Sequence, residues 1–137
     1  MSRLAVGEQL PLLEEGPLTR TDFVRYQGAS GDMNAIHHDD ELARSHGFPG
    51  VFAVGMRQAG VLASYLADTF GPDCIREFSV RFEEQAWPGD IITYQVTVAT
   101  RYSTVDSTFF ELDLLATRQS GSPHLTGNAK VCMAANK

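Results

Sequence analysis

Four segments of alternating apolar and polar residues occupy the second half of this 137-residue chain and constrain its fold more than any other feature. Their apolar positions are Phe78, Val80 and Phe82; Ile92, Tyr94, Val96 and Val98; Phe110, Leu112, Leu114 and Ala116; and Leu125, Ala129, Val131 and Met133. Alternation with period two is typical of a strand that buries one face and exposes the other. We therefore expect an antiparallel sheet that covers something on a single face.

A long helical pattern precedes these strands and is the candidate for what the sheet covers. It runs from residue 55 to residue 70, and Gly71 and Pro72 end it. Small and apolar residues recur in it at helical spacing: Met56, Ala59, Gly60, Ala63, Leu66, Ala67 and Phe70. At this chain length, one long helix wrapped by a curved antiparallel sheet, an α+β arrangement, is the fold that the pattern favours.

Shorter elements are expected before the long helix. Residues 9–13 have the pattern of a short strand. A helix follows Thr19, which together with Asp22 matches a capping box. A second short helix is expected over residues 41–46, capped by one of the two aspartates that precede it.

Charge and composition exclude several classes of partner. A formal net charge of −6 argues against nucleic acid and anionic membrane surfaces, because both attract positive charge. No apolar run approaches the roughly 20 residues of a membrane span, and we expect no signal peptide. Cys74 and Cys132 lie outside any metal-binding spacing, so we interpret them as thiols in a reducing compartment rather than as a disulfide. Residues 1–137 are expected to form one cytoplasmic domain.

The loop of residues 28–37 holds the side chains that are best suited to proton chemistry. Asp32 and His37 lie five positions apart, and they converge if the loop folds back. A carboxylate beside an imidazole is a general acid–base pair, which suits the addition of water to a double bond or its removal. The alternative is that the two are only a helix cap and a surface imidazole. The neighbouring His38 and His46 are expected in solvent.

The same segment also has a spacing found in metal sites. His37 and Asp39 form an H-x-D pair, and His124 could complete a two-histidine, one-carboxylate iron site. An H-x-D pair occurs often by chance, however, and the chain is short for the barrels that carry this triad. No phosphate-binding loop, serine nucleophile elbow or zinc-type cysteine pair is present. We therefore expect neither a metal nor a cofactor.

The sequence around this loop resembles a known motif. Residues 26–37 read Tyr-Gln-Gly-Ala-Ser-Gly-Asp-Met-Asn-Ala-Ile-His, which resembles the S-G-D-x-N-P-x-H motif of MaoC-like proteins, the (R)-specific enoyl-CoA hydratase (hydratase 2) family. Two later family segments, G-F/L…A-H-G-M and R-F…P-G-D, are similar to residues 47–56 and 81–90. The similarity covers nearly the whole chain, in order.

This resemblance implies a hot-dog fold in which two protomers lie side by side, with the active site near their interface. It also implies a tunnel that admits the acyl chain of a thioester. The family's catalytic aspartate and histidine fall on Asp32 and His37, and the backbone N–H that polarises the thioester carbonyl falls on Gly55. The substrate-pocket residues that the resemblance implies are Asn34, Val54 and Met56.

The implied reaction is the reversible hydration of a trans-2-enoyl thioester to an (R)-3-hydroxyacyl thioester, on coenzyme A or a carrier protein. An N–H at a helix N-terminus suits this chemistry, because it offers a donor and a favourable dipole to the oxygen where charge develops. The expected assembly is a homodimer, or a heterodimer with another hot-dog subunit. A coenzyme A site on this acidic chain needs a local basic patch, for which the candidates are Arg76, Arg81, Arg101, Arg118 and Lys130.

Three residues depart from the family pattern. Ala35 replaces a proline, Val54 stands where the histidine of A-H-G-M is common, and Arg57 adds a charge that we expect to reach solvent along its stem. Val54 and Arg57 favour an alternative, a partner-dependent or non-catalytic subunit that binds acyl thioesters. A further alternative is a hot-dog thioesterase, whose carboxylate on the central helix could only be Asp68.

Overall fold

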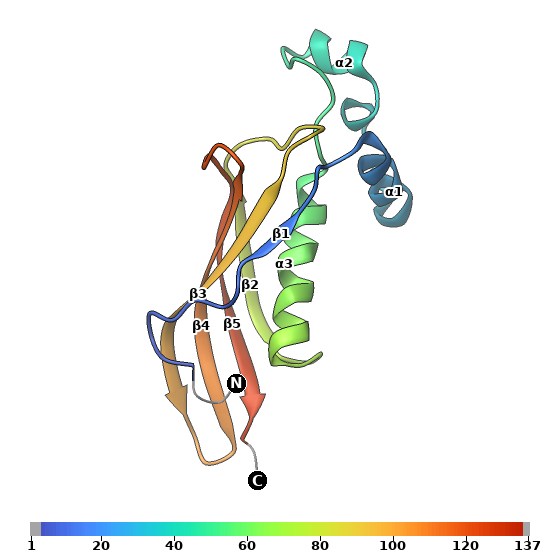
Figure 1. Ribbon diagram of the computed structural model, residues 1–137. Coiled ribbons are helices and arrows are strands. Elements are labelled where there is room, and N and C mark those ends of the chain that lie inside the picture. Colours follow the sequence, from blue (N-terminus) through green and yellow to red (C-terminus); the bar gives the residue numbers. More distant parts are fainter. Residues whose placement is uncertain (1–3, 136–137) are drawn as a thin grey trace.

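The alternating segments form one antiparallel sheet around the long helix, as the sequence predicts (Figure 1). The computed structural model describes residues 4–135. In chain order the elements are β1 (Leu13–Glu15), α1 (Arg20–Ser30), the short 3-10 helix η1 (Ala35–His37), α2 (Asp40–Ser45), α3 (Gly55–Phe70), β2 (Ile75–Phe82), β3 (Ile92–Ser103), β4 (Ser107–Arg118) and β5 (Pro123–Ala134). No described helix is long and apolar enough to cross a membrane.

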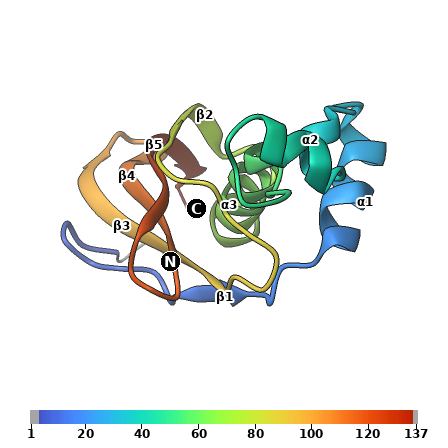
Figure 2. The same ribbon diagram turned by 90° about the horizontal axis from the view of Figure 1, so that it is seen from above.

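The five strands lie in the order β1-β3-β4-β5-β2, so that β1 and β2 are the two edges of the sheet. Seen from above, the sheet curves around α3, while α1 and α2 lie near the N-terminal end of that helix (Figure 2). This is the expected α+β arrangement.

The inner faces of β3 and β4 form the centre of the core. Each of the apolar positions predicted for these two strands is buried. The edge strand β2 differs, because Phe82 at its end is 48% exposed. In β5, Met133 is only partly buried, whereas Leu125, Ala129 and Val131 lie in the core. A strand at the edge of a sheet has neighbours on one side only, so the alternation in β2 produces less burial.

The buried face of α3 is rotated from the face that the sequence pattern indicates. The helix buries Gln58, Ala59, Leu62, Leu66 and Phe70. Met56 is 54% exposed and Gly60 also faces solvent, which corrects the predicted stripe. The prediction failed because it excluded a polar residue from the core. Gln58 is fully buried, and its amide has hydrogen-bond partners there.

For the short N-terminal elements, the sequence predicted the helix caps correctly but not all of the bounds. Thr19 and Asp22 form the predicted capping box of α1, and Asp39 caps α2. The first strand begins at Leu13 rather than at residue 9, and a single bridge joins Gln9 to Thr97 ahead of it. Both cysteines are free thiols, as predicted.

Candidate active site

His37 is held by its backbone position and by one hydrogen bond from its ring. It ends η1, the turn that Asn34 starts by accepting a hydrogen bond from the backbone N–H of Ile36. The His37 side chain is largely buried, and its Nδ1 lies 2.8 Å from the carbonyl oxygen of Phe52. Because a carbonyl only accepts, Nδ1 carries the hydrogen. The lone pair of the neutral imidazole is therefore on Nε2.

The Nε2 atom of His37 is available to a ligand. Within residues 4–135 it has no hydrogen-bond partner, whereas every fully buried side-chain nitrogen or oxygen in that range has one. The ring lines a pocket of about 140 Å³. The residues around the pocket are His37, Phe52, Ala53, Gly55, Phe82, Glu83, Glu84, Gln85 and His124. An imidazole that can accept a proton thus borders an open space.

Gly55 brings the N-terminus of α3 to the same pocket. Val54, the residue that precedes the helix, offers no side-chain cap, and the Gly55 N–H has no partner among the described residues. A free N–H at this position, reinforced by the helix dipole, favours an oxygen that carries negative charge. Glycine also leaves room for a neighbour, since a Cβ here would lie 2.5 Å from Cε1 of Phe82.

Asp32 does not reach this pocket. It follows Gly31, whose left-handed backbone (φ 80°) ends α1, and its side chain is exposed. Its carboxylate accepts a hydrogen bond from the backbone N–H of Asn34 at 3.2 Å. Among residues 4–135, no hydrogen bond or ion pair links Asp32 to His37. The structure therefore brings His37 and Gly55 together at one space, but not Asp32.

Gln27 organises the loop that carries Asp32 and His37. It is almost fully buried, and its Nε2 donates to the carbonyl oxygens of Asp32 (3.0 Å) and Asn34 (2.9 Å). Its Oε1 lies 2.9 Å from Nδ1 of His38. One amide thus satisfies two loop carbonyls and one imidazole. The sequence shows a glutamine on the predicted helix, but it does not reveal which partners its side chain contacts.

The three residues predicted for the substrate pocket lie around it rather than along it. Asn34 is exposed and caps η1, Val54 is buried beneath the start of α3, and Met56 faces solvent. None of them lines the pocket that holds His37. Their predicted contact with substrate therefore stays a prediction.

His124 is a second imidazole on the pocket wall. It comes from β5 and is 2% exposed, with Nδ1 2.6 Å from the carbonyl oxygen of Glu84 and Nε2 3.1 Å from Nε2 of Gln58. Burial lowers the pKa of His124, so its neutral form is favoured. Sequence reasoning considered this residue only as a metal ligand. Among the described residues, no group of three histidine, cysteine, aspartate or glutamate side chains could hold a metal ion.

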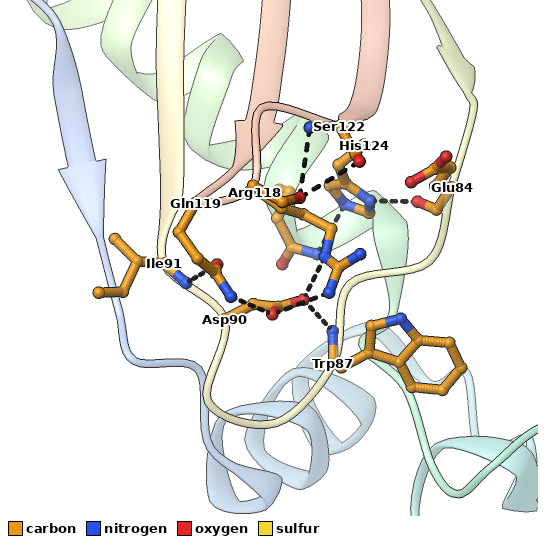
Figure 3. A network of polar contacts seen from close by, with 10 residues as sticks. Glu84, Trp87, Asp90, Ile91, Arg118, Gln119, Ser122 and His124 are labelled. Carbon is orange, nitrogen blue, oxygen red and sulfur yellow. Dashed lines mark hydrogen bonds and ion pairs between the residues drawn. The ribbon is translucent and has the colours of Figure 1, made fainter.

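The loop between β2 and β3, which supplies one pocket wall, is tied to the β4–β5 hairpin through Asp90 (Figure 3). Asp90 accepts hydrogen bonds from Nε of Arg118 (2.7 Å), from Nε2 of Gln119 (2.9 Å) and from the backbone N–H of Trp87 (2.8 Å). Burial alone would raise the pKa of Asp90, but these hydrogen bonds outweigh it and hold the pKa below its ordinary value. Arg118, a candidate for the basic patch of a coenzyme A site, is therefore paired with Asp90.

Arg57 corrects a second expectation about charge. Instead of extending to solvent, it lies across from Glu15 of β1, with NH1 2.9 Å from Oε1 and NH2 3.2 Å from Oε2. Asp68, the carboxylate of the thioesterase alternative, is exposed about 20 Å along the α3 axis from Gly55 at 1.5 Å of rise per residue. Asp68 therefore does not line the pocket that holds His37 and Gly55.

Comparisons with known proteins show the family and the fold of this chain. The model of the MaoC like domain matches residues 3–115. The chain belongs to the MaoC-like dehydratase family. The family is named for dehydratases, so hydration or dehydration is the general class of activity that the match supports.

A curated relative of this MaoC-like domain is the peroxisomal hydratase-dehydrogenase-epimerase of Saccharomyces cerevisiae. The two are 29% identical over 103 residues, which is 73% of this chain but only 11% of the relative. The MaoC-like chain thus spans about a tenth of that protein, so the activities named for the whole relative are not assigned to it.

Solved structures place the MaoC-like chain in the hot-dog fold. The (R)-hydratase of A. caviae involved in PHA biosynthesis is 24% identical with a TM-score of 0.83, covering 97% of this chain and 99% of that one. The MaoC-like dehydratase of Rhodospirillum rubrum is 19% identical with a TM-score of 0.86, covering 100% and 97%. The ChsH1-ChsH2 complex of Mycobacterium tuberculosis is 22% identical with a TM-score of 0.81, covering 94% and 98%. The expected fold is confirmed.

Proposed function

We propose that this MaoC-like chain catalyses the reversible hydration of trans-2-enoyl thioesters to (R)-3-hydroxyacyl thioesters, carried on coenzyme A or a carrier protein. The observation that carries the proposal is the shared pocket. It is bordered by an imidazole with a free acceptor nitrogen at His37 and by the uncapped start of α3 at Gly55. A base and an oxyanion donor on one small space are what the addition of water to an enoyl thioester requires.

In this proposal, water binds at Nε2 of His37, which accepts a proton as the water oxygen attacks C3 of the enoyl group. Electron density moves to the thioester oxygen, where the Gly55 N–H donates a hydrogen bond. A proton is then delivered to C2, so the net change is the addition of H and OH across the double bond. No oxidant, metal or cofactor enters this balance.

Asp32 is proposed as the second proton-handling group. This assignment rests on its place in the S-G-D-x-N motif of the family that the chain matches. Its exposed carboxylate, five positions before His37, is free to exchange its contact with the Asn34 N–H for one with water. The Asp32→Asn variant tests this role apart from that of His37.

A second hot-dog subunit, identical or different, is proposed to pack beside this one. The edge strand β2 ends at the half-exposed Phe82, which also lines the pocket. An edge strand has unpaired backbone groups that can bond to another chain, and a neighbour there would complete the pocket. We also propose that the enzyme works in the cytoplasm.

The decisive experiment follows the loss of enoyl absorbance when the protein is mixed with short trans-2-enoyl-CoA. His37→Asn is the sharpest variant, because its amide nitrogen can keep the hydrogen bond to the Phe52 carbonyl while Nε2 is removed. We expect kcat/KM to fall about 10²- to 10⁴-fold, as for loss of a general base. His46→Asn, which changes an exposed histidine, is the control. Wild-type rates in His37→Asn, or an inactive wild type across a panel of chain lengths, would contradict the proposal.

A further inference from the structure

Both ring nitrogens of His124 are committed to partners from different elements. Nδ1 faces the carbonyl oxygen of Glu84 in the β2–β3 loop, and Nε2 faces the amide nitrogen of Gln58 on α3. The carbonyl can only accept, so Nδ1 carries the hydrogen and Nε2 accepts from Gln58. His124 therefore joins a pocket wall to the central helix through a single ring.

The orientation of the Gln58 amide is set by Arg57. NH1 of Arg57 lies 3.2 Å from Oε1 of Gln58, which directs the amide nitrogen toward His124. Arg57 is itself held by two contacts with Glu15, and the hydroxyl of Tyr94 donates to the same carboxylate. The contacts run from β3 through β1 and α3 to β5. In this series of contacts, Arg57 orients the Gln58 amide, a role that its position in the sequence did not suggest.

The wall that His124 anchors borders the same pocket as His37. Glu83, Glu84 and Gln85 line the pocket, and the next residue, Ala86, accepts a hydrogen bond from the backbone N–H of Ala53 at 2.8 Å. Farther along the loop, the Trp87 ring lies 5.8 Å from that of Phe52. Because Phe52 supplies the carbonyl that holds His37, the position of this loop is linked to that of the imidazole.

We propose that His124 is a positioning residue. Held as its Nδ1–H tautomer by the Glu84 carbonyl and by the Gln58 amide that Arg57 orients, it fixes the Glu84 carbonyl and thereby one wall of the pocket that His37 lines. Its effect on substrate rests on the hydratase function proposed above. The fixing of the wall does not, and it is measurable without substrate.

The first measurement is the tautomer of His124, read from long-range ¹⁵N–¹H correlation spectra of the free protein. The Nδ1–H form is expected in the wild type. In Arg57→Met, where the Gln58 amide loses the donor that orients it, a shift toward a mixture of tautomers is expected. An Nε2–H wild type would overturn the proposal.

The second measurement compares two variants that each keep one end of the imidazole. Asparagine places an amide nitrogen near the position of Nδ1 and keeps the bond to Glu84, whereas glutamine reaches the position of Nε2 and loses it. Amide exchange at Ala53, which the Ala86 carbonyl protects, reports on the wall. Exchange about tenfold faster in His124→Gln and near wild type in His124→Asn is expected. Equal exchange in the two variants would overturn the proposal.

Kinetic measurements on His124→Gln and His124→Asn test the effect on substrate separately from the proposed hydratase function. With an active wild type, His124→Gln is expected to raise KM about tenfold with little change in kcat, while His124→Asn stays close to wild type. Equal KM values in the two variants would contradict the effect on substrate. An inactive wild type would defeat the proposed function alone, because the tautomer and the Ala53 exchange still decide whether His124 fixes the wall.

Discussion

Nδ1 of His37 donates to the carbonyl oxygen of Phe52 at 2.8 Å, across 15 residues of sequence. The Phe52 ring also meets the imidazole edge-on, with ring centroids 5.1 Å apart. Phe52 therefore determines both which nitrogen of His37 carries the hydrogen and how the ring is turned. The residue that orients the proposed base lies outside the motif that contains it, in the segment leading into α3.

Gly55 is expected to matter for the shape of the site more than for stability. In Gly55→Ala, the new Cβ would meet the Phe82 ring at 2.5 Å, and that half-exposed ring would have to move within the pocket. We expect unfolding free energy to change by less than about 1 kcal/mol, and hydratase kcat/KM to fall by about 10- to 100-fold.

Phe82→Ala added to Gly55→Ala is the matched test of that explanation. If the clash with Phe82 causes the loss, the double variant recovers activity relative to Gly55→Ala alone. If the loss of activity in the double variant equals the sum of the losses in Gly55→Ala alone and Phe82→Ala alone, the Phe82 ring is not the cause.

Gln27 is expected to be a stability determinant of the loop that carries Asp32 and His37. Gln27→Leu fills the same buried space, but it leaves the carbonyls of Asp32 and Asn34 without their shared donor. We expect a loss of about 1–3 kcal/mol in urea unfolding. Val24→Ala on the exposed face of the same helix is the control and should change little. Equal losses in the two variants would argue against the role of the amide.

Asp90 is expected to stabilise the fold at neutral pH and to lose this contribution in acid. Asp90→Ala leaves Arg118 and the Trp87 N–H without their carboxylate, at a cost of about 1–3 kcal/mol at pH 7, because the Arg118 side chain is partly exposed to solvent. The folded pKa of Asp90 lies below its unfolded value, so its ionised form contributes fully above that value. The contribution disappears as pH falls through the folded pKa.

Urea unfolding between pH 7 and pH 3 checks this sign. The wild type should lose stability toward the acid end, and Asp90→Asn should lose less over the same range. Asp22 and Asp40, whose pKa values are also lowered by their hydrogen bonds, remain in both proteins and cancel in the comparison. Parallel pH profiles would contradict the prediction for Asp90.

A second pH dependence of folding stability, at milder acidity, is expected from His124. Burial lowers its folded pKa below the ordinary 6.5, so the unfolded chain binds more protons as pH falls through that value. Stability is therefore expected to decrease from pH 7.5 to pH 5.5, and less so in His124→Asn. Denaturant midpoints at the two pH values measure it. Midpoints that shift equally in both proteins would exclude His124 as the source.

Much of this protein could be predicted from residue order because the signals are local. The apolar alternation of β3 and β4, the capping box at Thr19 and the bounds of α3 each depend on residues within a turn or a strand of one another. The motif containing Asp32 and His37 is equally local, and it led to the family that the comparisons show.

Tertiary contacts decided what could not be predicted in this way. Gln58 lies in the core instead of Met56 because its amide meets His124, 66 positions later, and Arg57 faces inward because Glu15 is across from it. Partners so far apart in the chain leave no periodic trace, since hydrogen bonds form between whichever polar groups the fold brings together. Residue order alone therefore determined the strands, the central helix and the proposed base; only the folded chain decided which groups orient that base and enclose it.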